Sequence, residues 1–182
     1  MLLEKNNLIT ENDCDEIIKI AENQFRQATT LGENNGHRIA DFTWIYRNVP
    51  IANKLREIAS LETGLPIENM EDLHVVRYNV GGQYKEHHDF FHPGEPYYPG
   101  EVSRGGQRVK SIIFYLNDDF EGGETDFPKM TITVKPIKGK TIIWDNINVD
   151  GALDYDSIHA GLPVTKGVKY IATIWIRENI FK

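Results

Sequence analysis

The chain has 182 residues, 40% of them hydrophobic, which is enough for one domain with a substantial core and too little for two. Its formal net charge is −7 and its lysines and arginines are scattered, which argues against a surface that follows a nucleic-acid backbone. The single cysteine, Cys14, excludes an intramolecular disulfide. We therefore expect one domain over residues 1–182, with no nucleic-acid partner.

The N-terminal segment MLLEKNNLITENDCDE becomes acidic before any apolar signal-peptide stretch develops. No segment of the sequence approaches the length and apolar character of a membrane span. These features predict a cytoplasmic protein with no membrane partner.

Residues 1–70 carry the signals of two helices. Thr10 and Asp13 form a capping-box pattern at the start of the first. The apolar residues that follow at helical spacing are Cys14, Ile17, Ile18, Ala21 and Phe25. A second helix is predicted to begin at Pro50 and to end before Gly64. We expect both to cover a sheet, so that residues 1–70 form an N-terminal helical support.

From Leu73 onward the sequence changes to short β-rich runs separated by glycine, proline and aspartate. The runs read LHVVRYNV, RVKSIIFYLN, MTITV, KTIIW and VKYIATIWI. Many short strands with turn residues between them favour an antiparallel sandwich or a double-sheet jelly roll. The predicted fold is mainly β with supporting helices, and its jelly-roll core spans residues 73–180.

A metal-binding pattern lies in the segment RYNVGGQYKEHHDF, at the end of one strand-like run. Alternate side chains of a strand share a face, so His87 and Asp89 point the same way and His88 points away. The later segment SIHAGLPVTKGVKY supplies a further histidine, His159. Two imidazoles and one carboxylate form the facial triad of non-haem Fe(II) oxygenases, which leaves the opposite coordination positions open.

The other histidines are interpreted as surface or core residues, because a lone histidine is seldom a ligand. They are His37, His74 and His92, while His88 points away from the face of His87 and Asp89. His88 and His92 have the spacing of a zinc pair on a helix, but no glutamate follows His88 and Pro93 and Gly94 come at once. This argues against a zincin-type site.

Lys169 indicates that the metal site also binds a cosubstrate. The residues that share its strand face are Ile171, Thr173 and Trp175. A buried, unpaired ammonium costs several kcal/mol, so an anion is expected against Lys169 rather than solvent. The far carboxylate of 2-oxoglutarate would fit, while its 2-oxo acid end would chelate the iron. We expect a hairpin to bring Lys169 beside His159.

Residues 91–107 form a long connection that reads FHPGEPYYPGEVSRGGQ. It leaves directly from the proposed metal segment, and loops of this length in compact domains are usually functional lids or disordered. We interpret it as a loop that covers the substrate.

Taken together, the chain resembles the prolyl 4-hydroxylase family of Fe(II)- and 2-oxoglutarate-dependent dioxygenases over nearly all of residues 1–180. The matching stretches are ENMEDLHVVRYNVGGQYKEHHDFF, GGQRVKSIIFYLND, FEGGETDFP, VKPIKGK and SIHAGLPVTKGVKYIATIWI. The resemblance implies a double-stranded β-helix, that is, a cupin-like jelly roll. It also implies Fe(II) as the metal, 2-oxoglutarate and O2 as cosubstrates, and possible use of ascorbate. The similarity is to collagen-type enzymes in a stand-alone microbial or viral form.

The resemblance assigns roles to ten residues of this sequence. The iron ligands and catalytic residues would be His87, Asp89 and His159. The 2-oxoglutarate contacts would be Lys169, Tyr78 and Thr173. The contacts to a substrate peptide would be Tyr84, Arg108, Trp175 and Glu71. The simpler alternatives are core packing for the two aromatic residues of this last group and an ordinary ion pair for the arginine.

The implied reaction is hydroxylation of an unactivated C–H bond, in particular prolyl 4-hydroxylation of a proline-containing peptide or protein, with release of succinate and CO2. One departure concerns the substrate, because Arg177 stands where family members that act on peptides often carry histidine. Hydroxylation of a free amino acid or small metabolite therefore remains an alternative. A non-catalytic jelly-roll binding module, or a zinc hydrolase with the same ligands, remains a further one.

Overall fold

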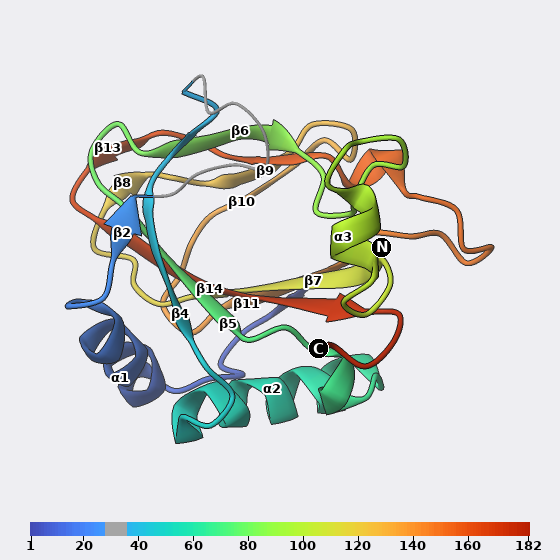
Figure 1. Cartoon of the computed structure of the whole chain (residues 1–182). Helices are drawn as coiled ribbons and strands as arrows, with labels where there is room; N and C mark the ends of the chain where they lie inside the picture. Colours follow the sequence, from blue (N-terminus) through green and yellow to red (C-terminus); the bar gives the residue numbers. More distant parts are fainter. Residues whose placement is uncertain (28–35) are drawn as a thin grey trace.

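Two antiparallel sheets face each other in the computed structural model, which describes residues 1–27 and 36–182 (Figure 1). The larger sheet has the order β1 (Leu2–Lys5), β11 (Thr141–Asp145), β7 (Arg108–Tyr115), β14 (Lys169–Arg177), β5 (Leu73–Tyr78), β4 (Asp41–Ile45) and β2 (Arg26–Gln27). The smaller has the order β10 (Ile132–Val134), β9 (Thr125–Phe127), β12 (His159–Gly161), β6 (Gln83–His87) and β3 (Arg38–Ile39). β13 (Val164–Lys166) pairs with β8 (Glu121–Gly122). The predicted mainly β jelly roll is confirmed.

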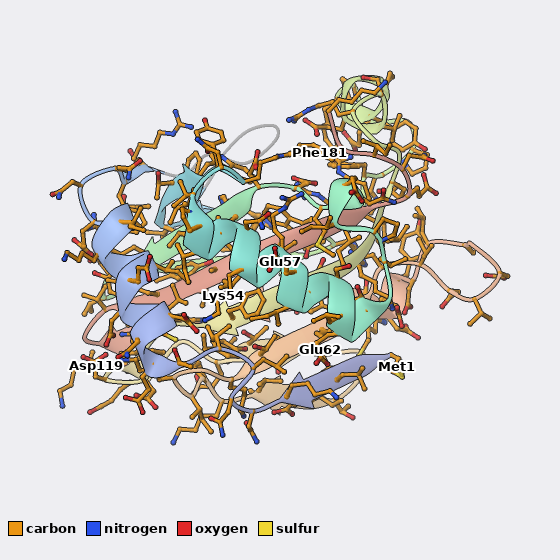
Figure 2. The ribbon with its side chains drawn as sticks, turned by 90° about the horizontal axis from the view of Figure 1, so that it is seen from below. Met1, Lys54, Glu57, Glu62, Asp119 and Phe181 are labelled. Carbon is orange, nitrogen blue, oxygen red and sulfur yellow. The ribbon has the colours of Figure 1, made fainter. Side chains whose placement is uncertain are left out.

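The two predicted helices, α1 (Glu11–Ala21) and α2 (Pro50–Thr63), cover the outer face of the larger sheet (Figure 1). The capping box is present, with both reciprocal hydrogen bonds between Thr10 and Asp13. Figure 2, seen from below, shows α2 lying across the strands, and its Lys54 forms an ion pair of 2.7 Å with Asp13. α1 ends before Phe25, whose ring instead lies under the guanidinium of Arg77.

Residues 1–70 contribute more than the predicted helical support, because β1, β2, β3 and β4 also lie in this segment. β1 and β2 form the two edges of the larger sheet, and β3 forms one edge of the smaller. Edge strands this short, with mostly exposed residues, leave little alternating hydrophobic pattern for a sequence prediction.

The strand β14 shows how the fold makes an interior cavity. Ala172, Ile174 and Ile176 belong to the core beneath the helices, whereas Ile171 packs between the two sheets. Alternation therefore turns Lys169 and Thr173 toward the space between the sheets, as predicted.

The predicted hairpin between His159 and Lys169 is wrong. β12 belongs to the smaller sheet and β14 to the larger, and β13 lies on the connection between them. His159 and Lys169 consequently line one recess from opposite sheets instead of from neighbouring strands.

The shorter helical segments are η1 (Ile67–Asn69), α3 (Tyr98–Val102) and η2 (Tyr155–Ser157). Among the described residues, no helix is long and apolar enough to cross a membrane.

Candidate functional site

His87, Asp89 and His159 come together at the smaller sheet, with Asp89 in the bend that follows β6 and not on the strand itself as predicted. β6 ends at His87 and β12 begins at His159, and the antiparallel register places these two residues directly opposite each other. Nε2 of His87 lies 3.7 Å from Oδ1 of Asp89, and Nε2 of His159 lies 3.9 Å from Oδ2. The three candidate ligand atoms all lie within 4.8 Å of one another, which suits a single metal ion.

Backbone carbonyl groups fix the orientation of both imidazole rings. Nδ1 of His87 lies 2.8 Å from the carbonyl oxygen of Lys85, and Nδ1 of His159 lies 3.0 Å from that of Ser157. A carbonyl oxygen can only accept, so Nδ1 carries a proton in each ring and Nε2 is the ring nitrogen that faces Asp89. The ring of Tyr84 stacks on His87 with centroids 3.5 Å apart.

The charges at the site also suit a metal. Burial, together with the nearby His159, lowers the pKa of His87 well below its ordinary value, so its imidazole is neutral at neutral pH. Burial alone would raise the pKa of Asp89. The net pKa is nevertheless lowered, because the effect of burial is outweighed by electrostatic interactions with His159, His87 and Arg108 and by the hydrogen bond from Ser111. Neutral imidazole and ionised carboxylate are the ligand forms that Fe(II) requires.

Lys169 is buried and lines a recess that these ligands also line. Its Nζ donates to the carbonyl oxygen of Gly123 at 2.5 Å, and no salt-bridge partner for it lies among the described residues. Burial lowers the pKa of Lys169 to about 7, although Glu124 acts in the opposite direction. A buried ammonium with no anion fits the terminal carboxylate of a dicarboxylic acid.

The EGGET segment, residues 121–125, makes room for this lysine. Gly123 has φ 69°, and a Cβ added there would lie 3.0 Å from Cδ of Lys169. Both the backbone conformation and the close approach therefore require glycine.

Two connected cavities gather the ten residues assigned by resemblance. An open cleft of about 760 Å³ is lined by Glu71, Tyr84, Arg108 and Trp175. The narrower recess is lined by Tyr78, Lys169 and Thr173. His87 and Asp89 line both cavities, and His159 lines the recess. The fold thus places the proposed metal ligands where the cleft meets the recess.

A buried charge cluster lies at one wall of the cleft. Glu71 accepts hydrogen bonds from Arg108 at 2.7 and 2.9 Å and from Arg177 at 2.6 Å. The guanidinium of Arg108 also lies 3.8 Å from the ring centre of Trp175. Glu71 therefore pairs with two arginines, whereas Arg108 lines the cleft and has a further contact, from Nη1 to the carbonyl oxygen of Asp89 at 3.5 Å.

The connection over residues 91–107 is tied down at its base. The side chain of Gln107 accepts from the backbone N–H of Phe91 at 2.6 Å and donates to the carbonyl of Phe91 at 2.8 Å. Arg177, fully buried, donates to the carbonyl oxygens of Glu101 and Gly106. Residues of the loop line the cleft. That the loop covers the substrate stays a prediction.

The remaining histidines form no second metal centre in the described parts of the chain. His88 and His92 pack against each other and against Phe90 and Tyr155. His74 is buried, with its ring 4.6 Å from Trp44 and 5.1 Å from Trp175.

Comparison with known proteins identifies the family. A model of the 2OG-Fe(II) oxygenase superfamily matches residues 73–177, which include the triad and Lys169. The chain belongs to this superfamily. It is 35% identical to a protein of Acanthamoeba polyphaga mimivirus that is provisionally assigned as a prolyl 4-hydroxylase, over 97% of this chain and 74% of the viral protein. It is 32% identical to prolyl 4-hydroxylase 2 of Arabidopsis thaliana, over 95% of this chain and 66% of the plant protein.

The fold of this 2OG-Fe(II) oxygenase is also found among solved structures. It is similar to the crystal structure of a viral collagen prolyl hydroxylase from Paramecium bursaria Chlorella virus-1 in complex with 2OG, with a TM-score of 0.78 and 28% identity over 97% of this chain and 95% of that one. The predicted resemblance to prolyl 4-hydroxylase-like dioxygenases is confirmed. So are Fe(II) as the metal and 2-oxoglutarate as the cosubstrate of the family.

Three polar contacts of the 2OG-Fe(II) oxygenase site were not predicted: those of Gly123, Arg177 and Ser111. Ser111 donates to Asp89 at 2.6 Å. The sequence does single out Ser111, because it is a small polar residue inside the apolar run RVKSIIFYLN. In the structure it is fully buried. Its partner could not be read from the sequence, because the pairing depends on how the strands assemble.

Proposed function

We propose that this chain is a prolyl hydroxylase that acts on an extended, proline-containing peptide. The observation that carries the proposal is the open, aromatic-lined cleft that reaches His87 and Asp89 and continues into the recess of Lys169. The relatives described above, named as prolyl 4-hydroxylases, support the same substrate class.

In this proposal each group has a distinct task. His87, Asp89 and His159 would hold Fe(II), and Lys169 would bind the far carboxylate of 2-oxoglutarate with Tyr78 and Thr173 beside it. Iron with 2-oxoglutarate and O2 supplies the oxidation of an unactivated C–H bond, with release of succinate and CO2. Fe(II) and Lys169 together carry three positive charges, and Asp89 and the cosubstrate carry three negative ones, so the loaded site is neutral.

The peptide would lie in the open cleft. Tyr84 and Trp175, whose rings stack on His87 and on Arg108, line the cleft and would contact a pyrrolidine ring with their remaining surface. Arg108, fixed by Glu71, would donate to a peptide carbonyl. A free amino acid would need a smaller, closed pocket with groups for its ammonium and carboxylate. The open shape of the cleft favours the peptide. Ascorbate use and a cytoplasmic location stay predictions.

The proposal is tested by incubating the Fe(II)- and 2-oxoglutarate-loaded protein with proline-rich peptides and with free proline, in parallel, followed by mass spectrometry. We expect a gain of one oxygen on prolyl residues of the peptides, accompanied by succinate, and no gain on free proline. Oxygen incorporation into proline alone would assign the chain to free amino-acid hydroxylases instead. Succinate without any product in either arm would point to a different substrate.

The binding of 2-oxoglutarate is expected to weaken as pH rises above neutrality. The free protein holds Lys169 with a pKa of about 7, but a carboxylate against it favours the ammonium and raises that pKa in the complex. Above pH 7 binding must therefore take up a proton, and the affinity should fall by roughly tenfold per pH unit between pH 8 and 9. Below pH 7 the lysine is already charged and the dependence should vanish.

Calorimetry of anaerobic 2-oxoglutarate binding in two buffers of different ionisation enthalpy measures this proton directly. At pH 8 we expect uptake of close to one proton by the wild-type protein and none by Lys169→Met. Binding at pH 8 without proton uptake would show that Lys169 is charged before the ligand arrives.

A further inference from the structure

Two fully buried polar side chains lie behind Asp89 and have no part in the function proposed above. They are Ser111 on β7 and Asn146, the first residue after β11, and each has 0% exposed surface. Burying two polar side chains costs free energy unless they form hydrogen bonds. Their contacts therefore indicate what they do.

The hydrogen bonds of this pair run in one direction, toward Asp89. Nδ2 of Asn146 lies 2.9 Å from Oγ of Ser111, and an amide N–H can only donate, so the serine hydroxyl accepts there. Its single proton is then donated to Oδ2 of Asp89, at 2.6 Å. A distance this short is typical of a hydroxyl bound to an ionised carboxylate.

Both members of the pair are held by the backbone of the larger sheet. Ser111 shares its strand face with Ile113 and lies opposite Trp144 in the register of β7 and β11. The backbone N–H of Asn146 donates to the carbonyl of Val109, and its own carbonyl accepts from the N–H of Asp154, both at 2.9 Å. Backbone hydrogen bonds thus fix the position of Asn146, from which the chain of hydrogen-bond donors begins.

We propose that Ser111 and Asn146 are positioning residues that restrict Asp89 to a single metal-binding oxygen, Oδ1. This inference rests on the proposed iron site. A hydrogen bond from Ser111 occupies Oδ2 and lowers its basicity, so that it competes poorly as a second ligand. Three protein ligands would then leave positions on a bound metal open for 2-oxoglutarate and O2. A bidentate aspartate would take one of these positions.

The test uses Co(II), which occupies such sites without consuming O2, in the anaerobic protein with 2-oxoglutarate. In Ser111→Ala we expect Oδ2 to become a second ligand that competes with 2-oxoglutarate, so that the affinity of the Co(II)-loaded protein for 2-oxoglutarate falls by about 10–100-fold, the size of effect seen for other partners of metal ligands. We also expect a changed Co(II) visible spectrum, since its intensity depends on coordination number. Ser111→Thr keeps a hydroxyl and should restore both, and Asn146→Leu should shift both in the same direction as Ser111→Ala.

Thr141→Val is the matched control. Thr141 is also fully buried in the larger sheet, but its hydroxyl has no hydrogen-bond partner among the described residues. It should keep the wild-type affinity and spectrum. Wild-type behaviour of Ser111→Ala, or an equal loss in Thr141→Val, would overturn the proposal, and should Ser111→Ala not fold, a wild-type spectrum in Asn146→Leu would do so.

The same titrations keep this inference separate from the proposed function. A wild-type protein that binds Co(II) and 2-oxoglutarate but does not hydroxylate prolyl peptides contradicts the substrate assignment and leaves the role of Ser111 intact. A change at Ser111 without effect on the metal contradicts only the positioning role.

Discussion

Replacing His87, Asp89 or His159 with alanine is expected to abolish succinate formation and to remove the bound iron. Each change deletes one of three protein ligands whose candidate atoms lie within 4.8 Å of one another. Loss of a residue that merely orients a ligand costs about 10–100-fold in metal affinity or activity, so loss of a ligand itself should exceed 100-fold. The fold should survive, because most of the buried apolar core lies elsewhere.

Metal content after anaerobic loading, measured beside succinate formation, separates this explanation from unfolding. His92→Ala is the matched control for metal content, since His92 lies in the same cleft but outside the triad. It should retain one iron per chain. A triad variant with full iron content and wild-type turnover would remove that residue from the ligand set.

The sequence predicts those parts of the structure that depend on local signals. The capping box at Thr10 and the end of α2 at Gly64 are set by hydrogen bonds and backbone conformation within one turn of helix. The inward face of β14 follows from alternation along a single strand. Such signals need no knowledge of which strands pair.

The triad and Lys169 could be proposed from the sequence for another reason. A metal or a buried ammonium demands particular chemistry of its surroundings, so the residue types themselves restrict the possibilities. The course of the chain between His159 and Lys169 could not be predicted from the sequence, because a short connection permits either a hairpin or a crossing to the opposite sheet. The structure shows the crossing.

The polar contacts around the ligands depend on long-range assembly. Ser111 meets Asn146 only because β7 and β11 pair in one register, and Arg177 meets Glu71 only because the ends of β14 and β5 are neighbours. A shift of one residue in either pairing would turn these side chains to the other face of the sheet. No local pattern specifies that register.

Replacing Lys169 with methionine is expected to weaken 2-oxoglutarate binding by about 10²–10³-fold while leaving iron binding intact. The lysine lines the recess, and its Nζ has the Gly123 carbonyl as its hydrogen-bond acceptor. Removing one partner of a buried ion pair costs about 3–5 kcal/mol, since the remaining charge is left without compensation. Free protein should not lose stability in the same way, because no salt-bridge partner of this lysine lies among the described residues.

The measurement is the KM for 2-oxoglutarate in succinate formation, together with Fe(II) affinity in the absence of cosubstrate. Lys140→Met is the matched control, since Lys140 is also largely buried but pairs with Glu4 at 3.0 Å, outside both cavities. It should leave the KM unchanged. An unchanged KM in Lys169→Met would make Lys169 a structural residue and would require a different cation for the cosubstrate. Loss of iron affinity in Lys169→Met would instead mean that the recess and the metal site form one structural unit, because the charge of Lys169 would then affect the geometry of the metal ligands.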